Sequence, residues 1–196
     1  MAQGEGRVAA CCAALAALAL ALGVALVAAY AFVVPVRVTV DDASLGGLAL
    51  AGPSPANGTA SIAYNVSLAV SLHNHNWAMS VWLTAPLVAE LRFRGHTFLR
   101  SESSGDDWER IHALSKAVYG MEAAEESAPM ALGRGGAAEF ARERAAGVFD
   151  LELAVFAEVK YEARRRRRAI RVTCPLRLSP SAEPAPPGAF ARVVCT

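Results

Sequence analysis

Few residues of this chain have the types and spacing that chemistry needs. His73-Asn74-His75 is the best candidate for a metal site, because two histidines at positions i and i+2 of a strand share one face. A metal site also needs a third ligand and partners that orient the ligands, and no residue near this motif in the sequence supplies them. Glu152 and Glu158 are the carboxylates that a hydrolase of wall polymers would use, but the strand pattern places both on a solvated face. We therefore expect no catalytic, cofactor-binding or metal-binding residues.

The sequence also lacks the common catalytic signatures. It contains no G-x-x-x-x-G-K-[ST], G-x-G-x-x-G, H-E-x-x-H or G-x-S-x-G motif, and His96 and His112 are isolated in the sequence. A formal net charge of +1 argues against a nucleic-acid-binding protein, which would need a basic face. These observations favour a protein that is not an enzyme.

Four residues of the second part of the chain are candidates for covalent modification. Asn57 and Asn65 each begin an Asn-x-Ser/Thr sequon, the first in a Pro/Gly-rich turn and the second on the polar side of a strand. Cys174 and Cys195 would form a disulfide between two strands if this part of the chain lies outside the cytosol. The alternative for this pair is two buried free thiols.

A long uncharged run from Val8 to Val34 precedes all of these residues. As a helix it would reach ~40 Å, which exceeds the ~30 Å hydrocarbon core of a bilayer. Ala29-Tyr30-Ala31 resembles a signal-peptidase site, but the run is longer than the apolar part of a signal peptide. A buried helix of a soluble protein would normally show a polar face. We therefore expect an uncleaved transmembrane signal anchor at residues 8–34.

The orientation of this segment follows from the lengths of its two flanks, because their charges are nearly balanced. Residues 1–7 would form a short cytosolic tail, and residues 35–196 one extracytosolic domain at the plasma membrane or an endomembrane. Cys11 and Cys12 at the cytosolic end are candidates for palmitoylation, or are simply small apolar residues in lipid. Gly23 and the alanines would permit helix contacts in a homo-oligomer.

Residues 35–196 show the alternation typical of β-strands. Apolar residues occupy every second position over Ser61–Leu72, Phe149–Tyr161 and Ile170–Leu178. Several strands with one apolar face each predict two sheets packed face to face, an all-β antiparallel β-sandwich. Shorter strand candidates are Val36–Val40, Val81–Leu83, Leu87–Phe93 and Arg192–Cys195.

The strand signal is lost between Ser101 and Gly147. The spacing of apolar residues from Trp108 to Val118 predicts a short amphipathic helix, and the acidic stretch Met121–Pro129 resembles a loop. A second helix is expected over Ala137–Ala146, ended by Gly147.

Five consecutive arginines, Arg164, Arg165, Arg166, Arg167 and Arg168, lie between two predicted strands. They could contact acidic lipid headgroups, wall polyanions or an acidic partner protein. The alternative, which we favour from the sequence, is a solvated hairpin loop that its charge keeps soluble.

The order of these features resembles the membrane-anchored, harpin-induced-like (NHL) branch of the plant late-embryogenesis-abundant group 2 family. The resemblance begins with the short tail, the single span and the strand containing Asp42-Ala43-Ser44-Leu45. His73-Asn74-His75-Asn76 then stands where the family has an N-P-N motif, with His75 in place of the proline. Later matches are Val81-Trp82-Leu83, Ala89–Gly95, Gly147-Val148, Tyr161 before the basic hairpin, and the two cysteines of the last strands.

The resemblance implies a β-sandwich of the fibronectin type III or immunoglobulin-like kind on a membrane anchor, with no enzymatic activity. It also implies roles in plant defence, the hypersensitive response or abiotic stress. By this analogy Asn74 and Asn76 would be structural turn residues. A protein or wall partner is expected at the acidic insert Ser101–Pro129 or at the arginine loop, whereas a dehydration protectant of membranes or wall components would need no such partner.

Overall fold

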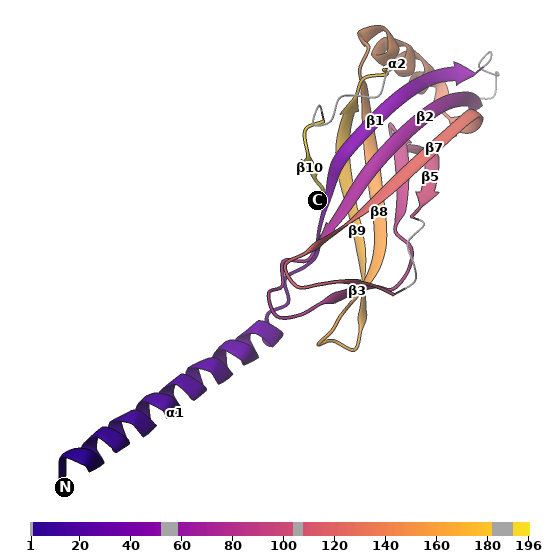
Figure 1. Ribbon diagram of the computed structural model, residues 1–196. Coiled ribbons are helices and arrows are strands. Elements are labelled where there is room, and N and C mark those ends of the chain that lie inside the picture. Colours follow the sequence, from indigo (N-terminus) through magenta and orange to yellow (C-terminus); the bar gives the residue numbers. More distant parts are fainter. Residues whose placement is uncertain (1, 52–58, 104–107, 182–189) are drawn as a thin grey trace.

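The computed structural model describes residues 2–51, 59–103, 108–181 and 190–196, and the structural statements below concern these ranges. Figure 1 shows one long helix joined to one end of a two-layered β-structure. The elements are α1 (Ala2–Ala31), β1 (Arg37–Ala51), β2 (Thr59–His73), β3 (Val81–Leu83), β4 (Val88–Phe93), β5 (His96–Glu102), β6 (Glu109–Ile111), β7 (Lys116–Ala131), α2 (Gly133–Ala146), β8 (Phe149–Tyr161), β9 (Arg167–Leu178) and β10 (Val193–Val194).

Two antiparallel sheets form the sandwich. The first has the strand order β10-β1-β2-β7, and the second is built around β8, which pairs with β9 along one side and with β4 and β3 along the other. Strands β5 and β6 extend the second sheet beyond β4 and β3. The buried apolar side chains of both sheets meet in one core. The prediction of an all-β antiparallel sandwich behind one N-terminal apolar helix is thus confirmed.

Strand β1 is much longer than the predicted segment Val36–Val40. The prediction stopped early because two bulges interrupt the alternation of apolar residues along the strand. The register with β2 shifts between Val40 and Asp42 and again between Leu45 and Gly47. Each bulge moves the buried positions by one residue, so that the core-facing parity changes twice along one strand. The buried side chains are therefore Val38 and Val40, then Ala43 and Leu45, then Leu48.

Two sequence-based predictions between Ser101 and Pro129 are wrong. Instead of an amphipathic helix, Trp108–Val118 contains the short strand β6, a turn, and the start of β7. Leu114 in that turn is exposed and has a positive φ of 54°, which no α-helix contains. The predicted loop Met121–Pro129 lies within β7, which pairs with β2 along almost its whole length.

The second helix is confirmed and begins earlier than predicted. Helix α2 ends at Gly147, whose φ of 69° places it in the left-handed region and whose N–H donates to the Arg144 carbonyl. Phe140 is its main core residue and packs edge-on against Phe93 and obliquely against Phe149. Helix α2 therefore closes the end of the sandwich opposite α1 (Figure 1).

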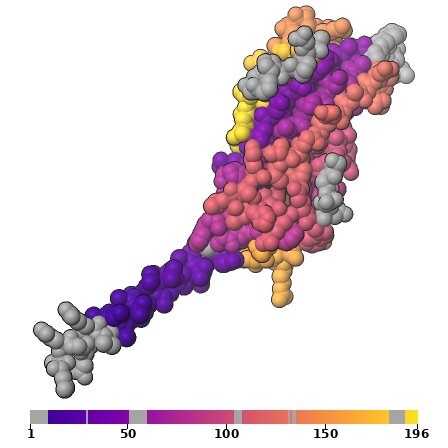
Figure 2. All heavy atoms as spheres, in the orientation of Figure 1, coloured from indigo at the N-terminus to yellow at the C-terminus, as the bar shows by residue number. Residues whose placement is uncertain are grey.

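Helix α1 projects from the sandwich without packing against it (Figure 2). Within it, Ala10–Ala28 is long and apolar enough to cross a membrane, and none of that stretch is buried by the rest of the chain. An apolar helix that no protein surface covers is compatible with a membrane span or a signal anchor.

Candidate functional site

The most elaborate polar site of the structure lies where α1 joins the sandwich. The chain leaves α1, passes through Val34 and enters β1. The Asn76 side chain binds both backbone polar groups of Val34, since its Oδ1 accepts from Val34 N at 2.8 Å and its Nδ2 donates to Val34 O at 2.9 Å. The amide side chain thus pairs with Val34 as a neighbouring β-strand would.

Asn74 holds Asn76 in place from a fully buried position. Its Oδ1 accepts from the backbone N of Asn76 at 3.1 Å and from Asn76 Nδ2 at 2.9 Å. Its Nδ2 lies within hydrogen-bond distance of three carbonyl oxygens, those of Met79 (3.0 Å), Ile111 (3.3 Å) and His112 (3.0 Å). Asn74 therefore connects the β2–β3 loop and the end of β6 to Asn76, the residue that holds the chain entering β1.

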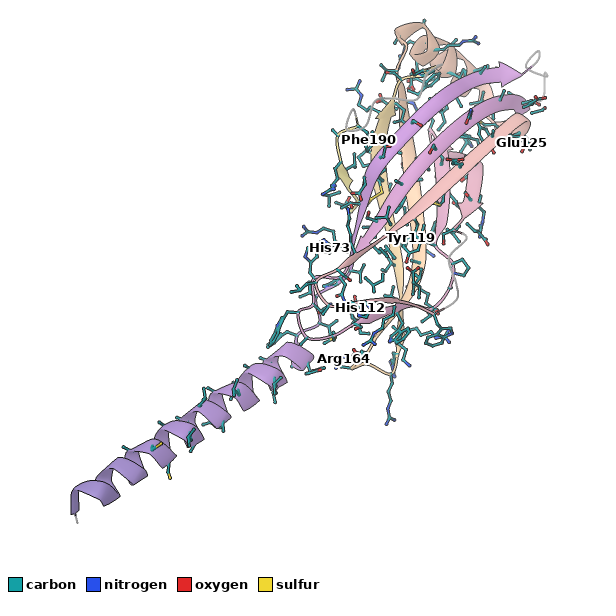
Figure 3. All side chains as sticks on the ribbon, in the orientation of Figure 1. His73, His112, Tyr119, Glu125, Arg164 and Phe190 are labelled. Atoms are coloured by element: carbon teal, nitrogen blue, oxygen red, sulfur yellow. A yellow bond between two sulfur atoms is a disulfide. The ribbon has the colours of Figure 1, made fainter. Side chains whose placement is uncertain are left out.

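Two further hydrogen bonds tie the same end of the sandwich to the chain that leaves α1. The buried Tyr161 hydroxyl at the end of β8 accepts from Val36 N at 3.1 Å. The Arg164 guanidinium donates to Ala31 O, the last residue of α1, at 2.9 Å. Figure 3 shows Arg164 beside the end of α1. A cation at a helix C-terminus is favourable because the last carbonyls carry partial negative charge.

The arginine run occupies the turn between β8 and β9 and the first residues of β9, as its sequence position predicts. Figure 2 shows this hairpin, in orange, projecting from the end of the sandwich at which α1 joins. Arg167 is fastened by an ion pair with Glu158 at 2.9 Å and lies 5.2 Å from the centre of the Trp108 ring. The base of the hairpin is thus fastened to β8 and to the residue that precedes β6.

The disulfide pair is formed. Cys174 of β9 and Cys195, directly after β10, are buried and bonded to each other at 1.98 Å. Thr196 then exchanges two backbone hydrogen bonds with Thr173, at 2.8 and 3.1 Å. Because β9 belongs to one sheet and β10 to the other, the disulfide links the two sheets along one side of the sandwich. The alternative of two free buried thiols is not what the structure has.

The other modification candidates occupy different places. Asn65 of β2 is exposed, as a glycan acceptor must be. Asn57 lies outside the described residues. Cys11 and Cys12 are free thiols on the exposed surface of α1.

The two histidines of the predicted metal motif stack on each other, with ring centres 3.9 Å apart. Burial, His75 and the cations Lys116, Arg37 and Arg192 together lower the pKa of His73. His75 Nε2 is buried without a hydrogen-bond partner. Within the described ranges, no three His, Cys, Asp or Glu side chains come together as a metal site.

The carboxylates that could have served a hydrolase are engaged elsewhere. Glu152 and Glu158 lie six positions apart on β8, which separates them by about 20 Å at ~3.3 Å per residue. A glycosidase needs its two carboxylates within about 5–10 Å of each other. Glu158 accepts from Thr84 Oγ1 at 2.7 Å, and this bond and the Arg167 cation lower its pKa.

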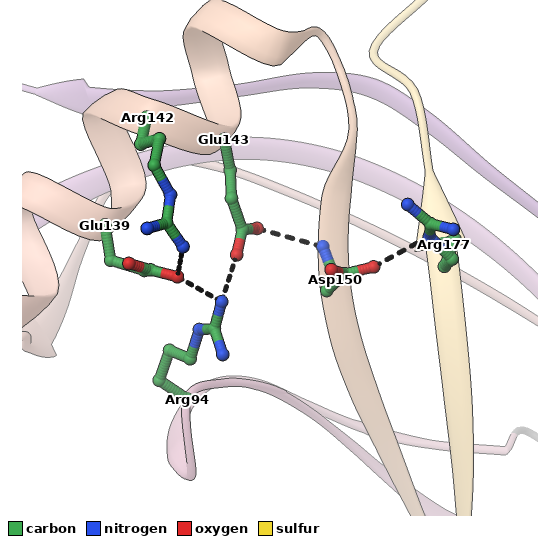
Figure 4. A network of polar contacts seen from close by, with 6 residues as sticks. All are labelled: Arg94, Glu139, Arg142, Glu143, Asp150 and Arg177. Carbon is green, nitrogen blue, oxygen red and sulfur yellow. Dashed lines mark hydrogen bonds and ion pairs between the residues drawn. The ribbon is translucent and has the colours of Figure 1, made fainter.

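A denser carboxylate group lies at the opposite end, under α2 (Figure 4). Glu143 is buried, and its two oxygens accept from Arg94 at 2.7 Å and from the backbone N of Asp150 at 2.9 Å. Glu139 bonds Arg94 and Arg142, and Asp150 pairs with Arg177 at 2.9 Å. Each acid thus has a cationic partner, so this network fastens α2 to the β4–β5 turn and to β8.

Sequence reasoning identified Asn74 and Asn76 as turn residues only through the family resemblance. It did not find their partners Val34, Tyr161 and Met79, because these lie far apart in the chain. It also placed the arginine run in a hairpin without showing that the hairpin contacts α1.

No protein-family model matches this sequence. No curated protein matches it either. An X-ray structure of a Northeast Structural Genomics Consortium target is similar with a TM-score of 0.44 and 12% identity, over 79% of this chain and 89% of that chain. A crystal structure of a protein from Archaeoglobus fulgidus is similar with a TM-score of 0.36 and 6% identity, over 72% of this chain and 98% of that chain. At these TM-scores neither likeness supports a statement about function.

Proposed function

We propose that this chain is a single-span membrane protein that holds a non-enzymatic β-sandwich close to the bilayer, on the extracytosolic side, as a binding module. The Asn74–Asn76 network carries the proposal. It fixes the chain within three residues of the end of α1 to the base of the sandwich, whereas a domain that merely followed a signal peptide would gain nothing from so close a connection. The Cys174–Cys195 bond supports the extracytosolic side, because disulfides persist in oxidising compartments.

The partner surface that we propose is the outer edge of β7. Strand β7 is an edge strand of its sheet, so one side of its backbone is available for pairing. Its side chains Glu122, Glu125 and Glu126 are exposed and give that edge negative charge. A basic protein segment or wall component fits this charge.

The resemblance to the harpin-induced-like branch of late-embryogenesis-abundant group 2 proteins supports a more specific proposal. In this proposal the binding module acts in plant defence, the hypersensitive response or abiotic stress. A dehydration protectant is the alternative within the same resemblance. A protectant would change stress survival, but pull-downs with the protein as bait would recover no partner. A binding module would recover a partner, and the variant Glu122→Lys with Glu125→Lys and Glu126→Lys would no longer bind it.

Membrane insertion and sidedness are tested on the full chain with a C-terminal tag. We expect the protein to stay in membranes washed with alkaline carbonate and the tag to resist protease added to sealed vesicles. A glycosidase should lower the apparent mass, and Asn65→Gln should remove that shift if Asn65 carries the glycan. Release by carbonate would refute the anchor, and digestion of the tag would reverse the topology.

A further inference from the structure

The strongest unassigned surface is the cationic hairpin between β8 and β9. All five arginines from Arg164 to Arg168 are exposed. Arg164 donates a hydrogen bond to the end of α1, and Arg167 forms an ion pair with Glu158 and a cation–π contact with Trp108. Among the residues that the structure describes, Arg165, Arg166 and Arg168 have no ion-pair partner. Three free guanidinium groups within four consecutive residues repel each other unless an anion lies between them.

The bond between Arg164 and α1 defines the depth of this hairpin relative to a bilayer. The most apolar stretch of α1 ends at Ala28, and the bond is to Ala31, three residues later. At 1.5 Å per residue this is about 5 Å beyond the hydrocarbon edge. The headgroup region is about 5–7 Å thick on each side of the hydrocarbon core. The hairpin therefore lies at the level of the lipid phosphates.

Exposed aromatic residues lie at the same level. Tyr30 and Phe32 stand at the end of α1, and the side chain of Phe32 is 78% exposed. Trp77 follows directly after Asn76, which binds Val34, and is 59% exposed. Large aromatic side chains are otherwise costly to expose, and the interface of a bilayer is where Trp and Tyr are enriched. Two independent features, charge and aromatic exposure, thus coincide at the headgroup level.

We propose that the Arg164–Arg168 hairpin, with Trp77 and Phe32 at the same depth, is a docking surface for anionic phospholipid headgroups in the leaflet at the C-terminal end of α1. The inference rests on α1 being a membrane span, as proposed above, and it holds for either orientation of the span. Arginine suits this ligand because its planar fork donates two parallel hydrogen bonds to one phosphate. The lipid is the occupant, since at this depth the headgroups of the protein's own bilayer surround the free guanidinium groups. Docking would fix the tilt of the sandwich on the membrane surface.

The test uses the full chain reconstituted into phosphatidylcholine vesicles that contain spin-labelled lipids. Electron spin resonance measures the association of labelled phosphatidylserine with the protein relative to labelled phosphatidylcholine. We expect a preference of at least about fivefold, which corresponds to a single arginine near an anionic surface. The variant Arg165→Gln with Arg166→Gln and Arg168→Gln should bring the preference close to equality. The matched control, Arg142→Gln with Arg144→Gln on the distal helix α2, should leave it unchanged.

A second arm needs no variant. Raising the salt from 0.1 M to 1 M should abolish the native preference, because screening shortens the reach of exposed charges from about 10 Å to about 3 Å. Equal association of both lipids with the native, incorporated protein would overturn the docking surface while leaving the anchor intact. A preference that persists in the triple variant would overturn it too, since another surface would then be responsible. Failure of the native chain to incorporate would instead refute the span itself.

Discussion

Asn74→Ala should be among the most destabilising substitutions outside the apolar core. The side chain is fully buried, and its two amide hydrogens are shared among the carbonyls of Met79, Ile111 and His112. Its oxygen accepts two further hydrogen bonds from Asn76. Four hydrogen bonds at a net value of about 1 kcal/mol each give a loss of about 4 kcal/mol in the free energy of unfolding. That is a large part of the 5–15 kcal/mol typical of a domain.

The measurement is urea unfolding of the full chain in micelles that keep α1 helical, followed by tryptophan fluorescence. At a slope of about 2 kcal/mol per molar urea, the midpoint should fall by about 2 M. Asn65→Ala is the matched control, because Asn65 is an exposed asparagine of the same β2 region and should cost less than about 0.5 kcal/mol in unglycosylated protein. Asn74→Asp keeps the shape but turns donors into acceptors facing three carbonyls, so it should cost at least as much. A loss below about 1 kcal/mol for Asn74→Ala would refute the role assigned to the network.

Three further predictions concern the sandwich. Cys174→Ser with Cys195→Ser should lower the free energy of unfolding by about 3 kcal/mol, because the disulfide closes a loop with a sequence separation of 21. Reduction of the native protein should lower the free energy of unfolding by the same amount. Gly147→Ala should cost about 1 kcal/mol because its φ is 69°, whereas Gly120→Ala, where a Cβ meets nothing within 4 Å, should not lower the melting temperature. The pKa of His73 is lowered below 6.5 in the folded state, so the unfolded chain binds more protons than the folded chain below that pH. The melting temperature should therefore fall as the pH drops through 6.5. The variant His73→Gln should make the melting temperature less dependent on pH in this range.

The alternation of apolar residues was sufficient for the strands that keep one register. Phe149–Tyr161 was predicted with its observed bounds, since every second position from Phe149 to Tyr161 is buried. Strand β7 was missed for the opposite reason. Its buried residues are Tyr119 and Met121 in one half and Ala128 and Met130 in the other, and a register shift against β2 separates the two parities. A period-2 pattern that changes phase within one strand averages to no pattern.

The junction could be predicted only in part, because its contacts are formed between residues far apart in the chain. The hydrogen bond between Val36 and Tyr161 spans 125 positions, and the one between Ala31 and Arg164 spans 133. Local propensity carries no information about such pairs.

The same junction has a mechanical consequence. With α1 anchored in a bilayer, as proposed above, a pull on the distal end of the sandwich would enter the domain through the stretch between Ala31 and Arg37. There it meets the Asn76 clamp on Val34 first and then β1, which runs lengthwise from the junction toward the distal end (Figure 1). Tension along β1 shears its hydrogen bonds to β2 together instead of opening them one at a time. Because these bonds must break together, the junction and β1 would resist such a pull more strongly than a pair of strands opened from one end.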